Sequence, residues 1–177
     1  MTQALAETGA DREKHSVGQG HRAAVLAGFL GWMLDAFDFF LVVFCLTGIA
    51  HEFHQTDRAI ALSITLTLAF RPVGALIFGY LADRFGRRGP LMLALVFYSV
   101  IELLSGLAPN YVTFLVLRAL FGIGMGGEWG VGTSLAMEAA PKASRGLLSG
   151  LLQQGYAAGY LLAALCYVFV FPRFGWR

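Results

Sequence analysis

Between two long apolar stretches, the chain carries the segment Gly79-Tyr80-Leu81-Ala82-Asp83-Arg84-Phe85-Gly86-Arg87-Arg88. Gly79 has no side chain and allows another helix to approach closely, and Gly86 permits a turn. Asp83 can cap or pair near a helix end. The arginines favour the cytosol, because cytoplasmic loops of membrane proteins are rich in Lys and Arg. A solvated basic loop would explain the charges but not the ordered Gly, Asp and Arg spacing.

Apolar stretches like the two beside this loop recur along the chain. The 177 residues are 57% hydrophobic and 14% charged, and the apolar residues gather in long blocks. A helix needs about 20 residues to cross the ~30 Å hydrocarbon layer. The blocks lack an alternating pattern, which favours helices over a barrel. We predict an all-α integral membrane protein with five spans, at residues 23–50, 59–81, 90–108, 111–137 and 146–171.

The Lys and Arg residues predict how these spans are oriented. They concentrate in the polar tail 1–22, in the loop around Arg84, and in the loop that holds Lys142 and Arg145. The loop 51–58 has one Arg, and Pro109-Asn110 has no basic residue. The positive-inside rule then places the N-terminus in the cytosol. Residues 1–22 lack a signal-peptide cleavage site and are expected to form a disordered cytosolic tail.

A second motif lies in the fourth expected span, Arg118-Ala-Leu-Phe-Gly-Ile-Gly-Met-Gly-Gly-Glu-Trp-Gly130. Its glycines do not form a nucleotide-binding loop, because no strand precedes them. Gly122, Gly126 and Gly130 share one helix face, where small residues let another helix pack closely. We therefore predict a tight helix contact along this face.

Both motifs resemble signatures of the major facilitator superfamily, the first between helices two and three and the second in helix four. Within the superfamily, three further segments resemble the sialate:proton symporters, most closely the lactate/pyruvate permeases. They are 32–40, 70–75 and 145–156.

The resemblance implies that residues 23–177 form part of an N-terminal six-helix half, which is built from two inverted three-helix repeats. Family members continue from a Gly-Trp-Arg like 175–177 into a sixth helix and a second half. Their substrate site lies between the halves, and the Asp that matches Asp83 works against a helix of the second half. Transport is therefore expected to need the missing C-terminal half or another subunit.

Six charged side chains fall inside the expected spans, and each costs at least about 2.5 kcal/mol there unless it has a partner or a water-filled cavity. Counted depths predict a pair between Asp35 and Arg71. They also predict an outer layer of Asp38, Glu102 and Arg118. The six are Asp35, Asp38, Arg71, Glu128, Glu102 and Arg118. Glu128 is expected nearer the cytosol, level with Gln153 and Gln154.

The four acids outnumber the two arginines, so spare carboxylates can carry protons while an Arg attracts a carboxylate substrate. Asp35 and Asp38 are three residues apart and share one helix face. The hypothesis assigns Arg71, Gln153 and Gln154 to substrate and Asp35, Asp38 and Glu128 to the proton. Structural or gating roles go to Gly79, Asp83, Arg84, Gly86, Arg87, Arg88, Glu102 and Arg118. The alternative is that both arginine pairs are fixed and only set helix registry.

The expected function is proton-coupled symport of a small monocarboxylate such as lactate or pyruvate across the cell membrane. Two alternatives stay open, a non-transporting fragment or partner subunit and a symporter of an aromatic or sugar acid. We expect no enzyme, metal, cofactor or nucleic-acid partner, since the net charge is only +2 and no catalytic or ligand pattern occurs. Cys45 and Cys166 are interpreted as packing residues, and 51–54 as a solvated loop rather than a zinc motif.

Overall fold

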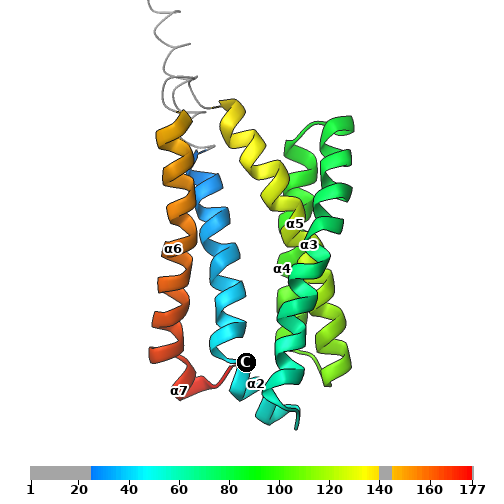
Figure 1. Cartoon of the computed structure of the whole chain (residues 1–177), viewed down its shortest axis with the longest axis vertical. Coiled ribbons are helices and arrows are strands. Elements are labelled where there is room, and N and C mark those ends of the chain that lie inside the picture. The colour runs from blue at the N-terminus through cyan, green and yellow to red at the C-terminus, as the bar shows by residue number, and fades with distance from the viewer. Residues whose placement is uncertain (1–24, 140–144, 177) are drawn as a thin grey trace, which may run out of the picture.

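The computed structural model describes residues 25–139 and 145–176, and every regular element in these ranges is a helix (Figure 1). The first helix is Val25–Phe44. It is followed by α2 (Leu46–Glu52), α3 (Asp57–Phe85), α4 (Arg88–Gly106), α5 (Tyr111–Ala139), α6 (Arg145–Phe169) and α7 (Phe171–Phe174). The predicted all-α membrane fold is confirmed. The tail expected at 1–22 lies outside the described residues.

The number of spans agrees approximately with the predicted five. Four helices in the described ranges are long and apolar enough to cross a membrane: Val25–Phe44, α3, α4 and α5. Helix α6 has 25 residues, so at ~1.5 Å per residue it is about 38 Å long. Gln153 and Gln154 interrupt the apolar sequence of α6, which is not one of these four helices. It therefore supplies the fifth span by length rather than by composition.

Two helix boundaries differ from the sequence-based expectation. Helix α3 continues to Phe85 and α4 begins at Arg88, so the expected loop from Gly79 is reduced to two residues. Gly86 makes the turn with φ 85°, a conformation that favours glycine. The expected span 23–50 is interrupted at Cys45, although hydrogen bonds of 2.9 Å continue on both sides of it. The arginines of this turn predict where the chain leaves the membrane, but the helical hydrogen bonds of α3 continue past that point.

Helices α3, α4 and α5 pack together as one unit, which we call the three-helix group. The packing is closest where glycines face backbone, because a Cβ at Gly122 or Gly126 would overlap a carbonyl oxygen of α3. The predicted tight contact is confirmed at these two positions. It is wrong at Gly130, which has open space around it, and the close approach expected at Gly79 is also absent. Figure 1 shows why: the last part of α5 leans away from α3 toward α6.

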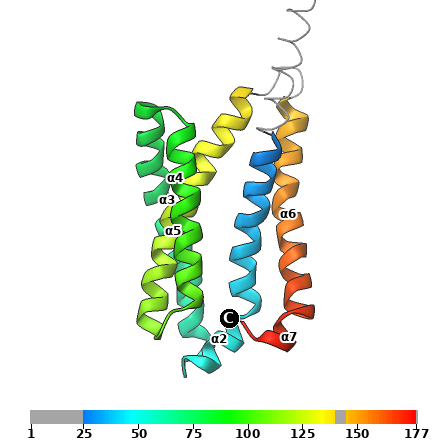
Figure 2. The same cartoon turned by 180° about the vertical axis from the view of Figure 1, so that it is seen from behind.

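The helix Val25–Phe44 and α6 lie side by side as a two-helix group (Figure 1 and Figure 2). Gly155 and Gly159 of α6 allow this contact, since a Cβ at Gly155 would lie 2.7 Å from the carbonyl oxygen of Phe29. Both helices start at the end of the molecule where α3 turns into α4, which we call the basic end (Figure 1). Helices α2 and α7 lie at the opposite end. Midway between the two ends, charged residues connect the two-helix group to the three-helix group.

Candidate functional site

Asp35 connects the two-helix group to the three-helix group. Its side chain is fully buried and its Oδ2 lies 3.6 Å from Nη2 of Arg71 on α3. The indole Nε1 of Trp129 on α5 donates a hydrogen bond to the same oxygen. The other oxygen, Oδ1, has no hydrogen-bond partner among the described residues. The predicted pairing of Asp35 with Arg71 is confirmed, but it is a single, long contact.

The guanidinium of Arg71 has weak partners besides Asp35. Its Nε donates to the sulfur of Met125 at 3.0 Å, and Nη2 also contacts this sulfur. A thioether is a weak acceptor. The guanidinium carbon lies 5.0 Å from the ring centre of Trp129 and 5.7 Å from that of Phe39. Within the described residues, no carboxylate meets Arg71 through two parallel hydrogen bonds, and its side chain is 18% exposed.

Glu128 belongs to the same central cluster. Its carboxylate is buried against Gly31 of the first helix, where a Cβ would overlap Oε1. It also hydrogen-bonds to Tyr98 and interacts electrostatically with Asp35 and Arg71. Glu128 thus lies one turn from Asp35 toward the basic end, at the level of the first helix against which Gly155 packs, as the sequence-based depth predicted. It belongs, however, to the same cluster as Asp35 and Arg71 and not to a separate one.

Arg118 and Glu102 form a second pair within the three-helix group. Nη2 of Arg118 donates directly to Oε2 of Glu102, which confirms the predicted pairing. The Arg118 side chain is 2% exposed, and its guanidinium carbon lies 4.6 Å from the ring centre of Phe121. Asp38 interacts electrostatically with both partners, as the predicted outer layer requires. Asp35 and Asp38 thus share a helix face but belong to different clusters.

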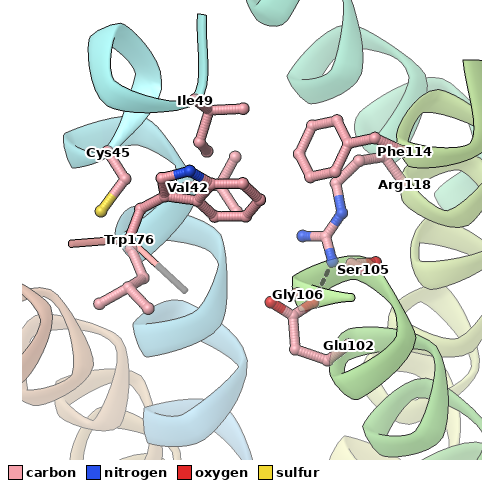
Figure 3. Close-up of a pocket in the computed structure, with 10 residues that line it drawn as sticks. Val42, Cys45, Ile49, Glu102, Ser105, Gly106, Phe114, Arg118 and Trp176 are labelled. Atoms are coloured by element: carbon pink, nitrogen blue, oxygen red, sulfur yellow. Dashed lines mark hydrogen bonds and ion pairs between the residues drawn. The ribbon is translucent and has the colours of Figure 1, made fainter. Parts of the chain in front are cut away.

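A small cavity of about 60 Å³ lies beside this second pair (Figure 3). Trp176 lies on one side of it and Arg118 on the other (Figure 3). Nε1 of Trp176 donates to Glu52 at 2.5 Å, and its ring lies 5.9 Å from that of Phe53. Since one water needs about 10–15 Å³ on this measure, the cavity has room for a few waters. It is too small for a metabolite.

The remaining predicted site residues lie apart from these clusters. Gln153 and Gln154 are exposed on α6, and no hydrogen bond joins them to Arg71. Asp83, Arg84 and Arg88 are exposed at the basic end, and Arg87 is half-buried there. The guanidinium of Arg84 lies 5.5 Å from the ring centre of Phe85. The structure brings together Asp35, Arg71 and Glu128, and it keeps the basic turn separate.

Sequence reasoning missed the neutral members of the central cluster. Trp129 bonds to Asp35 and stacks on Trp32 with ring centres 4.8 Å apart, while Met125 and Tyr98 contact the charged groups. Trp129 directly follows Glu128, and Met125 lies one helical turn earlier. The available signal in the sequence was Glu128, an acid inside a glycine-rich motif. Its neighbours along the helix are candidates for contact with charged groups.

The fold and these paired charges can be set beside known proteins. Residues 12–175 match the family model of the sugar (and other) transporters. The chain belongs to the sugar (and other) transporter family of the major facilitator superfamily. It is 34% identical over 160 residues to the sialic acid transporter NanX of Escherichia coli (strain K12), a match that covers 88% of this chain and 38% of that protein. The family model thereby places the chain among multi-pass membrane proteins.

Other relatives in this transporter family carry different substrate names. The niacin transporter NiaP of Acinetobacter baylyi is 33% identical, covering 93% of this chain and 38% of the relative. The shikimate transporter of Escherichia coli is 33% identical, covering 92% and 40%. The chain thus spans about two fifths of the length of these relatives. They are named as transporters, which is consistent with a non-enzymatic protein.

The central cluster suits a family member that handles an anion. A partly exposed arginine with weak partners can accept a carboxylate, because guanidinium and carboxylate match as paired donors and acceptors. Two buried acids beside it, each with one unpartnered oxygen, can take up a proton. Among the described residues, no cluster of three or more His, Cys, Asp or Glu could hold a metal ion.

Proposed function

We propose that this chain is the N-terminal part of a carrier that moves a small organic monocarboxylate together with a proton across the cell membrane. The observation that carries the proposal is the open state of Arg71. Its only carboxylate contact in the described residues is 3.6 Å long, whereas Nη2 of Arg118 donates directly to Glu102. An incoming carboxylate would offer Arg71 the two-bond partner that it lacks.

The surplus of acids supports proton coupling. Asp35 and Glu128 share the single cation Arg71, and Asp38 adds a third acid that interacts with Glu128 and the outer pair. When a substrate carboxylate occupies Arg71, Asp35 loses its counter-charge. A proton on Asp35 or Glu128 would then keep the buried cluster near neutrality. The substrate and the proton would bind together for this reason.

The names of the relatives support the chemical class of the substrate. Sialic acid, niacin and shikimate, which those relatives are named for, are small organic acids. Within this class, lactate or pyruvate and the aromatic or sugar acids are the candidates for this chain. The basic end would face the cytosol, and a second six-helix half would cover the open side of Arg71.

Uptake of radiolabelled lactate into proteoliposomes at two external pH values tests the proposal. The chain alone and a version extended by a second six-helix half are compared. Arg71→Ala should lower uptake by the extended version at least about tenfold, because a charged hydrogen-bond pair contributes about 1.5–3 kcal/mol. Arg58→Ala is the matched control, since Arg58 is exposed on the same helix. Uptake that survives Arg71→Ala would overturn the assignment of Arg71.

Two other results would decide between the alternatives. Uptake that does not respond to external pH would remove the proton from the mechanism and leave a carboxylate carrier. If the extended version transports lactate while the chain alone does not, the 177 residues are a non-transporting part of the carrier. If neither version transports any monocarboxylate, the proposed function is wrong.

A further inference from the structure

A stripe of tyrosines on α6 lies next to Arg71 and has no role in the function proposed above. Gln153, Tyr156 and Tyr160 are spaced at i, i+3 and i+7, so they share one helix face. Tyr156 interacts electrostatically with the guanidinium of Arg71, and its ring meets the edge of Trp129 at 6.2 Å. The stripe therefore begins at the arginine and runs along α6 toward the opposite end.

Phe40 of the first helix joins the two tyrosines into one aromatic surface. Its ring centre lies 5.4 Å from that of Tyr156 and 4.8 Å from that of Tyr160, with interplanar angles of 71° and 89°. These are edge-to-face contacts, the favoured geometry between aromatic rings. They hold the tyrosine rings in place from one side. The surface is thus ordered before any ligand binds.

The exposure of this surface is unusual for a membrane span. Tyr160 is 46% exposed and lies about 22 Å along α6 at ~1.5 Å per residue, well inside the helix rather than at a membrane interface. Tyrosines that face lipid are found mainly at the interfaces, where the hydroxyl reaches water. Gln153 is also exposed on the same face, and its amide would be unsatisfied in hydrocarbon. This face of α6 is therefore poorly suited to contact with lipid.

The neighbouring Trp129 cannot provide a ring-binding surface. Trp32 stacks on it with an interplanar angle of 10°, and the guanidinium of Arg71 lies over the ring at 5.0 Å. Two groups at stacking distance must occupy opposite faces of one indole. Tyr156 lies beside Arg71 and Tyr160 continues from it along α6, and neither ring is stacked face to face on another ring.

We infer that the carboxylate substrate carries a planar aromatic ring, and that Tyr156 and Tyr160 select it. The inference rests on the proposed function, since it uses Arg71 as the carboxylate site. The carboxylate pairs with Arg71, and the ring lies along Tyr156 and Tyr160. A small acid such as lactate would use only the first of these contacts.

Binding to the version extended by a second six-helix half, purified in lipid nanodiscs, tests this substrate class. Radiolabelled benzoate is the probe, and unlabelled benzoate, cyclohexanecarboxylate and lactate compete with it. Benzoate and cyclohexanecarboxylate have nearly the same size and charge but differ in the π system. Aromatic pairing is worth about 0.5–1.5 kcal/mol, so benzoate should bind about two- to twelvefold more tightly than cyclohexanecarboxylate.

Tyr160→Leu should remove most of this preference and leave lactate affinity unchanged. Tyr80→Leu is the matched control, because Tyr80 is an exposed tyrosine of α3 at 64%, close to the basic end. Equal affinity for the ring and its saturated counterpart would overturn the inference. So would an equal effect of the two Tyr→Leu variants.

The two proposals fail differently in this experiment. If lactate competes and Arg71→Ala abolishes the competition while benzoate shows no ring preference, only the aromatic substrate class is wrong. If no carboxylate binds to the extended version, the proposed function fails together with the inference. A ring preference that is lost in Tyr160→Leu but not in Tyr80→Leu would support both.

Discussion

The two arginine–carboxylate pairs differ in what they connect. Arg118 and Glu102 lie within the three-helix group and meet directly, and the arginine is 2% exposed. Arg71 and Asp35 join the three-helix group to the two-helix group, stand 3.6 Å apart, and leave the arginine 18% exposed. Both guanidinium groups lie near aromatic rings. Both pairs consist of an arginine and an acid, so residue type does not explain the difference. We call the pair within one helix group the closed pair and the pair between two helix groups the open pair.

This difference suggests how structure and transport are divided between the pairs. A pair inside one packed group can be as tight as its helices allow, since nothing has to pass between its members. A pair between two groups must leave access if a substrate is to reach it. We therefore assign a structural role to the pair at Glu102 and a substrate role to Arg71, and each prediction below tests that division.

The largest effect is expected from breaking the closed pair. Glu102→Ala leaves the buried guanidinium of Arg118 without its carboxylate, which in buried pairs costs about 3–5 kcal/mol of unfolding free energy. We expect a value near the lower limit, because Glu102 is 26% exposed. Unfolding by sodium dodecyl sulfate in mixed micelles, followed by circular dichroism, measures the change.

The double variant Glu102→Ala, Arg118→Met is the control for this loss. Removing both charges eliminates the unpaired cation, so the double variant should unfold at higher detergent concentration than Glu102→Ala alone. A double variant that is less stable than the single one would show that Arg118 is held by its neighbours and not by Glu102.

The next effect concerns the packing that positions Arg71. A Cβ at Gly126 would overlap the carbonyl oxygen of Arg71, so Gly126→Ala must push α5 away from α3. Overpacking of this kind typically costs about 1–3 kcal/mol. The same unfolding measurement should show the loss, and carboxylate affinity should fall with it because Arg71 moves. Gly130→Ala is the control on the same face, where nothing lies within 4 Å.

The control variant Gly130→Ala is also expected to change the free energy of unfolding in a definite direction. Ala favours a helix over Gly by about 1 kcal/mol, so Gly130→Ala should leave stability unchanged or raise it slightly. Equal losses at the two positions would mean that helix propensity, and not contact with α3, governs this face.

Much of the fold could be predicted from the sequence, because few backbone structures can satisfy their hydrogen bonds in lipid. Long apolar blocks must be helices in a membrane, and glycines one turn apart predicted where α5 touches α3. Gly130 failed because α5 meets α3 there through side chains such as Val131 and no longer through backbone, and Gly79 failed because nothing lies within 4 Å of it. Spacing predicts a face, whereas the partner on that face depends on helix tilt.

Only the charged residues of the candidate site could be predicted from the sequence. Ionisable residues in a span need partners, which was enough to pair Asp35 with Arg71 and Glu102 with Arg118. The neutral partners were not predictable, since an indole or a thioether in a span usually serves packing. Trp129 became visible as a partner of Asp35 only when three helices were placed together.

A smaller effect is expected at the opposite end, where Trp176 joins α2. Trp176→Phe keeps a ring against Phe53 but removes the donor to Glu52, so it should cost about 0.5–1.5 kcal/mol of unfolding free energy. Glu52→Gln should cost less, since the amide oxygen can still accept. If Trp176→Phe were as harmful as Glu102→Ala, the end of the chain rather than the closed pair would dominate stability.

The smallest change in stability is expected at the open pair, and it separates the two pairs most directly. Asp35→Asn keeps an oxygen that accepts from Trp129, removes a buried charge whose second oxygen is unpartnered, and leaves Arg71 with its contacts to Met125. Unfolding free energy should therefore change by less than about 1 kcal/mol. Uptake by the extended carrier should lose its dependence on external pH at the same time, because an amide cannot take up the proton. A loss of stability as large as that of Glu102→Ala would make the two pairs equivalent, and Asp35 would then be a structural partner of Arg71 like Glu102 is of Arg118.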